Sequence, residues 1–176
     1  WEGRFERIID GAKKSGYYCE LKIDGLAIDL VYKKGILSVG STRGDGTVGE
    51  DVTQNLKTVE AIPLQLLDEE EIVKNLSAKG GSAFGGKKLE KFTSGIRKAL
   101  TGELVIRGEV FITKKEFNRI NHDQKKAGLK IYANPRNLAA GSIRQLDPKL
   151  TAARPLRFRA WDMVREDPAE LPTNEY

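Results

Sequence analysis

The stretch that most constrains the fold runs from Tyr18 to Ile28, because polar and apolar residues alternate along it up to the glycine at position 25. Successive side chains of an extended strand point to opposite faces. The pattern therefore predicts a strand over residues 18–24 with one charged face and one apolar, core-facing side. The two sets are Glu20, Lys22 and Asp24 on the charged face, and Cys19, Leu21 and Ile23 on the apolar one.

Lys22 has two interpretations on these residues alone. An amine between two carboxylates, just before a glycine that lets a ligand come close, could be a nucleophile. The alternative is an outer strand face with exposed ion pairs, each of which contributes little. Short lysine–aspartate–glycine matches also arise by chance, so this stretch by itself favours the second interpretation.

Composition fits a single soluble domain with a real core, since 39% of the 176 residues are hydrophobic and 31% are charged. No apolar run suits a membrane span or a signal peptide. With one cysteine, Cys19, the natural compartment is a reducing cytoplasm, and we expect that thiol in the core. The single histidine, His122, has no partner set for a metal, so no metal site within the chain is predicted. A net charge of +5 permits binding to nucleotides or nucleic acids without establishing it.

The remaining pattern predicts an α+β fold with antiparallel sheets and helices outside. A Lys33–Gly35 turn joins the first hairpin. Residues 68–100, which hold an acidic run and a Gly/Ser/Lys-rich loop, are predicted to be an inserted surface excursion, and 165–176 a linker. The predicted helices are 1–16, a start at 50–55, 69–76, 89–100, 114–127 and 138–142, and the predicted strands are 18–24, 26–31, 36–41, 58–66, 103–112 and 155–164.

Three further segments carry chemistry-bearing residues. A glycine-dense loop over 41–53 displays Arg43 and Asp45, with a ligand-facing loop at least as favoured as a plain turn. In strand 103–112, Val105, Arg107 and Glu109 share one face. Arg136 and Arg144 lie eight residues apart, near two helical turns, and arginine suits forked phosphate contacts.

These motifs occur in a distinctive order: Glu-x-Lys-x-Asp-Gly at 20–25, Thr-Arg-Gly-Asp-Gly at 42–46, Arg-Gly-Glu-Val-Phe at 107–111 and Asn-Pro-Arg-Asn at 134–137. The sequence over about residues 1–164 closely resembles the adenylation (nucleotidyltransferase) domain of bacterial NAD-dependent DNA ligases. The stretch 133–148 resembles the NAD-dependent branch rather than the ATP-dependent one. The resemblance implies part of the DNA ligase/mRNA-capping nucleotidyltransferase (ATP-grasp-like) fold, for which we expect two antiparallel sheets packed about a nucleotide cleft.

The resemblance also implies roles for matching residues. Lys22 would take AMP from NAD, release nicotinamide mononucleotide, and pass the AMP to the 5′-phosphate of nicked double-stranded DNA, with Mg²⁺ as cofactor, in replication and repair. Cations must offset Glu20 and Asp24, because carboxylates favour the protonated amine. The implied roles are Glu20 for adenine, Glu109 for the ribose, Arg43 beside the adenosine, Arg136 and Arg144 for phosphates, and Asp24, Gly25, Asp45 and Arg107 in support.

Two parts of the family pattern are not found in this sequence: a small domain that precedes this one and recognises nicotinamide mononucleotide, and two later lysine-bearing motifs after about residue 164. We therefore expect the chain to need the remaining ligase domains and to be inactive alone. Two alternatives stay open. One is an ATP-dependent nucleotidyltransferase of the same fold, and the other is a non-catalytic nucleic-acid-binding module.

Overall fold

The computed structural model describes residues 3–4, 7–9, 19–44, 46, 48–78 and 87–164. Most of the predicted helix at 1–16, the predicted linker at 165–176 and the loop residue Asp45 lie outside these residues. None of the described helices is both long and apolar enough to cross a membrane.

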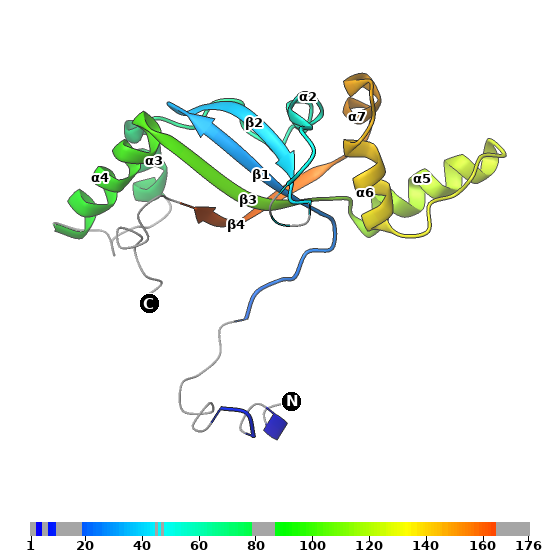
Figure 1. The fold of residues 1–176 in the computed structure, drawn as a ribbon, viewed down its shortest axis with the longest axis horizontal. Coiled ribbons are helices and arrows are strands. Elements are labelled where there is room, and N and C mark those ends of the chain that lie inside the picture. Colours follow the sequence, from blue (N-terminus) through cyan, green and yellow to red (C-terminus); the bar gives the residue numbers. More distant parts are fainter. Residues whose placement is uncertain are drawn as a thin grey trace.

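The described strands form one four-stranded antiparallel sheet in the order β2-β1-β3-β4 (Figure 1). The strands are β1 (Leu26–Lys33), β2 (Ile36–Thr42), β3 (Glu103–Phe111) and β4 (Arg157–Val164). The mixed helix and antiparallel-sheet class is confirmed. The expectation of two packed sheets is not met within the described residues, which hold this sheet alone.

The turn between β1 and β2 has the geometry that a tight hairpin needs. Lys34 and Gly35 both have positive φ, 51° and 75°. Two-residue hairpin turns favour positive φ at both central positions, because that backbone twist matches the twist of the flanking strands. The predicted Lys33–Gly35 turn is confirmed.

One face of the sheet is covered and forms the core. Helices α2 (Thr53–Leu56), α6 (Pro135–Ile143) and α7 (Pro148–Ala152) lie together on that side (Figure 1). Their buried side chains include Leu56, Leu138 and Ile143, which belong to the same cluster as alternate residues of β1 and β3. The remaining strand residues point to the opposite face of the sheet, and this face bears the polar residues of interest. The strand residues of the core cluster are Ile28, Leu30, Tyr32, Leu37, Leu104 and Val110.

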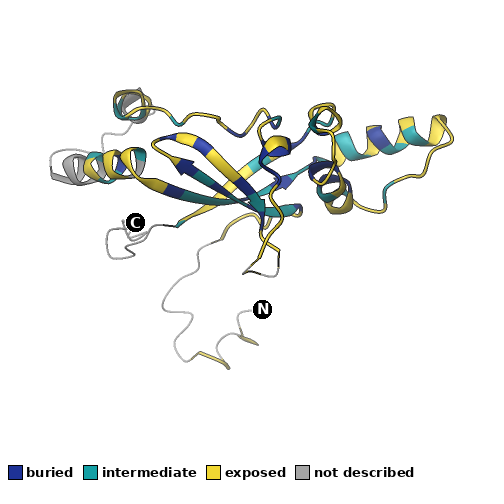
Figure 2. Ribbon diagram, turned by 45° about the horizontal axis from the view of Figure 1, so that its top comes forward, coloured by how far each residue is buried: buried dark blue, intermediate teal, exposed yellow. Residues whose placement is uncertain are grey.

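The strand predicted over 18–24 is wrong. Residues 19–24 have no regular secondary structure, Leu21 is 81% exposed and Cys19 is exposed rather than in the core. A strand needs a neighbour for its backbone groups. Within the described residues the sheet ends at β2 and β4, and residues 19–24 pair with neither. Alternating residue types therefore do not produce a strand here, and the segment before β1 is mostly exposed coil that leads away from the sheet (Figure 2).

The strand predicted over 58–66 is also wrong. Pro63 interrupts it, since proline has no N–H for a ladder, and only Gln65 forms an isolated bridge, to Ile36. Val59 and Ile62 are nevertheless buried, so the segment packs as a cover over the hairpin. Tyr32 donates its hydroxyl hydrogen to the Pro63 carbonyl at 2.7 Å, and burial raises the pKa of Tyr32 to about 12.

The two helices predicted within residues 68–100 are present, as α3 (Glu69–Ala78) and α4 (Lys87–Thr101). The predicted loop between them falls largely outside the described residues. The two helices lie at one end of the sheet, away from α5, α6 and α7 (Figure 1). Arg97 joins them through two hydrogen bonds of 2.8 Å from its Nε and a terminal amine to the Glu69 carboxylate. That this region is an insertion stays a prediction.

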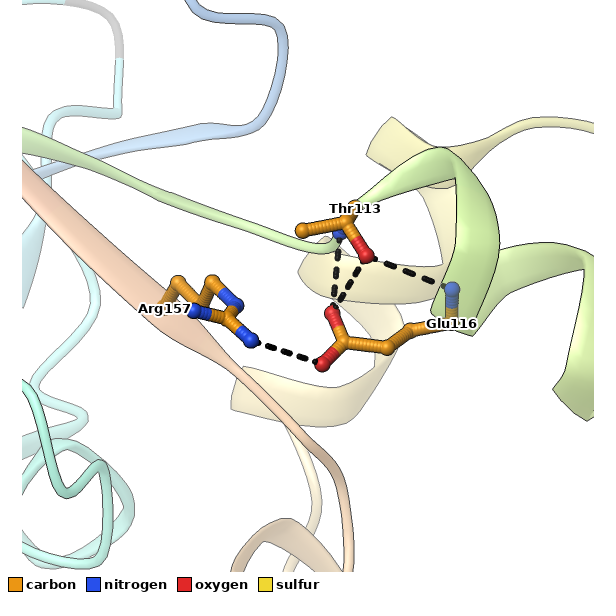
Figure 3. Close-up of polar contacts among 3 residues, drawn as sticks. All are labelled: Thr113, Glu116 and Arg157. Carbon is orange, nitrogen blue, oxygen red and sulfur yellow. Dashed lines mark hydrogen bonds and ion pairs between the residues drawn. The ribbon is translucent and has the colours of Figure 1, made fainter.

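Helix α5 (Lys114–Lys126) begins at a capping box and ends before Gly128, whose φ is +68°. Thr113 Oγ1 accepts from the Glu116 N–H, and Glu116 Oε2 accepts from the Thr113 hydroxyl at 2.7 Å. The second carboxylate oxygen of Glu116 accepts from Arg157 of β4 at 3.1 Å (Figure 3). One carboxylate thus joins the start of α5 to the start of β4.

Replacing Glu116 by glutamine should lower the free energy of unfolding by about 1–2 kcal/mol at pH 7. The hydrogen bond from Arg157, with those from Thr113, holds the pKa of Glu116 below its usual 4.5 even though burial raises it. A folded-state pKa below the unfolded one gives stability that is present above the unfolded value and is lost as pH falls through the folded value. Urea unfolding at pH 7 and pH 3 should show the difference from the parent chain shrinking at pH 3. The exposed Glu60→Gln is the control, and a gap that does not change with pH would contradict the assignment.

Candidate nucleotide-binding cleft

A cleft of about 820 Å³ opens where β1 begins and β2 ends, beside Glu109 of β3. This volume is within the range of small-molecule sites. Its walls come from the coil before β1, the end of β2, the middle of β3, β4 and both ends of α6. The residues lining it are Glu20, Leu21, Lys22, Ile23, Leu26, Ala27, Thr42, Arg43, Gly44, Glu109, Arg136, Arg144, Arg159, Ala160 and Trp161.

The cleft brings together six of the residues predicted from the sequence. They are Glu20, Lys22, Arg43, Glu109, Arg136 and Arg144. Glu20 and Lys22 reach it from exposed coil rather than from the charged face of the predicted strand. Asp24 and Gly25 adjoin the cleft through contacts described below, and Asp45 lies outside the described residues.

Glu109 is held by the backbone that follows Lys22. The Gly25 N–H donates to Glu109 Oε1 at 3.1 Å. Gly25 is buried against β3, and a side-chain carbon there would overlap the Val110 carbonyl oxygen and lie 2.9 Å from its carbon. Glycine therefore allows the chain to pass close to β3, and that passage fixes Lys22 and Glu109 relative to each other.

Helix α6 is tied to the cleft by an ion pair at each end. Arg136, in its first turn, lies 3.6 Å from the Asp24 carboxylate. Arg144, its C-cap residue, donates from Nε to Glu50 Oε2 at 2.7 Å. The two predicted phosphate-binding arginines therefore project from one helix, as their spacing predicted, and each is engaged by a carboxylate from a different segment.

A buried amide fixes α2 to α6 and α7. Asn55 is 7% exposed and donates from Nδ2 to the Gln145 carbonyl and to Thr151 Oγ1, both at 2.8 Å. Thr151 in turn donates to the Ser142 carbonyl at 2.8 Å. Buried polar groups are costly unless they are paired, so this network makes the position of α6 specific. It sets the backbone from which Arg144 extends.

The loop after β2 is closed by backbone contacts. The Thr42 N–H donates to the Glu50 carbonyl at 2.9 Å, and the Glu50 N–H donates to Thr42 Oγ1 at 3.0 Å. The Arg43 N–H donates to the Ala27 carbonyl at 3.1 Å. Gly44 has a φ of +54°, and a side-chain carbon there would overlap the Val48 carbonyl. The glycines predicted to make a ligand-facing loop thus fold it back tightly and present Arg43.

Arg107 does not line the cleft. It lies between its two cross-strand partners, 3.4 Å from Asp29 of β1 and 3.7 Å from Asp162 of β4. Its Nε is buried and has no hydrogen-bond partner within the described part of the chain. The arginine joins three strands on the face that carries Glu109, and its predicted supporting role stays a prediction.

The sequence reading missed Arg159 and Trp161 of β4. The register between β3 and β4 shifts beside Gly108, so that Arg107 faces Asp162 while Gly108 faces Ala160. This irregularity leaves Trp161 as the extra residue, and such bulges re-aim side chains next to sites. Arg159 lies opposite Glu109. The alternation of Arg157, Arg159 and Trp161 in the final predicted strand was the signal that could have identified them, but no role was assigned to these residues.

Positive charge dominates the cleft, which is lined by five cationic side chains and two carboxylates. Within the described residues Lys22, Arg43 and Arg159 form no ion pair. Trp161 is 47% exposed and offers an aromatic face on which a base could stack. The arrangement suits an anionic ligand that carries an aromatic ring.

The order of these cleft residues along the chain matches a known family. The model of the NAD-dependent DNA ligase adenylation domain matches residues 1–98 and 95–176. The chain belongs to this adenylation-domain family. Every residue that lines the cleft falls within the matched segments of the adenylation domain.

Individual relatives of this adenylation domain agree. The DNA ligase of Thermoanaerobacter pseudethanolicus is 47% identical over 168 residues, which is 96% of this chain and 20% of that protein. The DNA ligase of Citrifermentans bemidjiense is 44% identical over 158 residues, 89% of this chain and 19% of the relative. The DNA ligase of Thermomicrobium roseum is 40% identical over 172 residues, which is 98% of this chain and 21% of that protein. The chain thus spans about a fifth of the length of these curated relatives.

Proposed function

We propose that the protein carrying this adenylation domain is an NAD-dependent DNA ligase and that Lys22 is its nucleophile. The Lys22 amine, once deprotonated, attacks the α-phosphorus of NAD. A nitrogen–phosphorus bond forms, the phosphorus–oxygen bond to nicotinamide mononucleotide breaks, and AMP stays on the lysine. The AMP then moves to the 5′-phosphate of a DNA nick, and the 3′-hydroxyl displaces it to seal the strand.

One observation carries the proposal: Lys22 opens onto a cation-rich cleft in which Glu109 is anchored to the same backbone segment. Phosphoryl transfer depends mainly on positioning and on stabilising charge on the phosphorus centre. The four arginines that line the cleft beside Lys22 supply that stabilisation, and they also favour the neutral form of its amine.

The other groups take roles that fit their places. Glu109 accepts hydrogen bonds from the ribose hydroxyls, since one of its oxygens is fixed by Gly25. Glu20 and Trp161 contact the adenine, the indole by stacking. Arg136 and Arg144 contact phosphates of the donor or of the nick, and Arg43 lies beside the adenosine. Asp24 supports Arg136, and Asp45 and Arg107 are proposed as supporting residues.

Mg²⁺ fits this site as an ion shared with the substrate. Magnesium keeps several waters and takes one or two carboxylates together with substrate phosphates. Among the residues that the structure describes, no group of three or more potential ligands converges. Asp24, two residues after Lys22, is the carboxylate suited to share the ion with a phosphate, because Glu20 is assigned to the adenine. When bound, the ion would neutralise charge on the transferring phosphate.

Intact-mass measurement tests the proposal on the longest protein that the gene encodes. With Mg²⁺ and NAD we expect the mass to rise by one AMP, and with ATP we expect no change. An adduct from ATP alone would make the protein an ATP-dependent nucleotidyltransferase. No adduct from either donor, together with nick binding that survives Lys22→Ala, would leave a nucleic-acid-binding module. The same measurement on this chain alone tests our expectation that it is inactive by itself.

A further inference from the structure

Glu50 is the acidic residue at this site whose position the proposed chemistry leaves unexplained. Its carboxylate does not line the cleft, yet Oε2 accepts from the Nε of Arg144, which does. At 2.7 Å this is among the shortest of the described hydrogen bonds between charged groups. We infer that Glu50 is the positioning residue for Arg144: it holds the Nε edge of the guanidinium so that the terminal amines face a phosphate in the cleft.

The backbone of Glu50 is fixed although its side chain is 63% exposed. It exchanges two hydrogen bonds with Thr42, a buried residue that lines the cleft beside Arg43. The preceding residue, Gly49, passes so close to β2 that a side-chain carbon would overlap the Thr42 carbonyl oxygen. The carboxylate therefore starts from a point that is rigidly attached to the sheet.

The backbone of Arg144 is fixed as well, so only its long side chain is free to move. Its N–H donates to the Ala140 carbonyl at 3.2 Å, and the preceding residue, Ile143, is fully buried. A guanidinium has five N–H donors in a planar fork. One donor used by Glu50 leaves the terminal amines for a forked contact with phosphate, and the side chain loses less freedom when that contact forms.

The pair is too exposed to matter much for folding. The Arg144 and Glu50 side chains are 49% and 63% exposed, and such ion pairs contribute little to stability. Its effect is expected in ligand affinity instead. This inference rests on the proposed function only in requiring that Arg144 binds phosphate groups.

The direction in which Glu50→Ala changes the affinity for phosphate distinguishes a positioning role of Glu50 from a purely electrostatic one. Removing an acidic group beside an anion site makes the site more positive, so electrostatics alone predicts that Glu50→Ala binds phosphate more tightly. Positioning predicts the opposite, because the arginine is no longer held. Glu50→Gln keeps an acceptor for Nε while removing the charge, so it should bind at least as well as Glu50→Ala and recover most of the loss.

The probe is inorganic pyrophosphate, titrated into this chain at low salt and followed by calorimetry and by the NMR signal of the arginine Nε–H. We expect Glu50→Ala to bind about tenfold more weakly than the parent chain, with Glu50→Gln close to the parent. Glu60→Ala, which removes an exposed glutamate elsewhere, should leave the affinity unchanged. In an Arg144→Gln background, adding Glu50→Ala should cause no further loss.

Three results would overturn the inference: equal or tighter binding by Glu50→Ala, a full further loss in the Arg144→Gln background, or no pyrophosphate binding by the parent chain. None depends on adenylation. Absence of an AMP adduct on the longest protein would instead defeat the proposed function, while the order of pyrophosphate affinities would still decide the role of Glu50.

Discussion

Replacing Lys22 by arginine should abolish the AMP adduct, a fall in the rate of adenylation on the order of 10⁴-fold or more. Arginine keeps the positive charge in the cleft, but its guanidinium stays protonated and cannot attack phosphorus. The variant therefore removes the nucleophile and leaves the local charge unchanged. Intact-mass measurement on the longest protein of the gene, with NAD and Mg²⁺, gives the result directly.

Lys57→Arg is the matched control, since Lys57 is an exposed lysine after α2 and does not line the cleft. It should form the adduct at the parent rate. The Lys22→Arg protein should still seal a nick that already carries AMP on its 5′-phosphate, because that step does not need the lysine as a nucleophile. An adduct that persists in Lys22→Arg would assign the nucleophile to another residue.

Replacing Gly25 by alanine should have the second largest effect, because it acts on both the fold and the site. The new methyl group would overlap the Val110 carbonyl oxygen and lie 3.0 Å from Phe111 Cβ, so β1 and β3 must separate where they begin to pair. We expect a loss of about 3 kcal/mol in the free energy of unfolding. The Gly25 N–H would also move from Glu109, and misplacement by about 1 Å should slow adenylation on the order of 10²-fold.

Gly141→Ala provides the opposite result within the same chain. Gly141 lies in α6, and a side-chain carbon there would meet nothing within 4 Å. Alanine favours helix over glycine, so this variant should be up to about 1 kcal/mol more stable. Urea unfolding of both variants shows whether the loss of stability comes from the close approach of Gly25 to β3 or from replacing any glycine by alanine. Equal, small effects would show that the passage of Gly25 past β3 is loose.

Local chemistry made much of the fold predictable. The hairpin turn followed from Lys34–Gly35, and helix α5 from its periodicity and from Gly128. The capping box at Thr113 and Glu116 was also readable, as a threonine followed three residues later by a glutamate. The errors at 18–24 and 58–66 have different causes. Alternation predicts which faces a strand would have, whereas a neighbouring strand decides whether it forms, and residues 19–24 pair with no strand of the described sheet. In 58–66, Pro63 has no N–H for a ladder, so only the bridge between Gln65 and Ile36 forms.

The candidate site, like the fold, was predictable from the sequence only in part. The motifs identified Lys22, Arg43, Glu109, Arg136 and Arg144 as residues of one site, because each of these residues belongs to a motif, and the structure places all five at one cleft. Contacts between segments were not readable from the motifs. The Asn55 network and the Glu50–Arg144 hydrogen bond each join residues about ninety positions apart. The orientation of Trp161 depends on an irregularity between two strands, which neither strand shows alone.

The exposure of Cys19 has a practical consequence. It is the only cysteine in the sequence, and it lies three residues before Lys22 on a segment that reaches the cleft. A thiol-reactive fluorophore would therefore attach at a single known place beside the nucleophile. Its emission could report when a nucleotide or a nick enters, without a competing label elsewhere in the chain. Cys19, which the sequence predicted to be buried in the core, is therefore a suitable position for a fluorescent probe of ligand binding at the cleft.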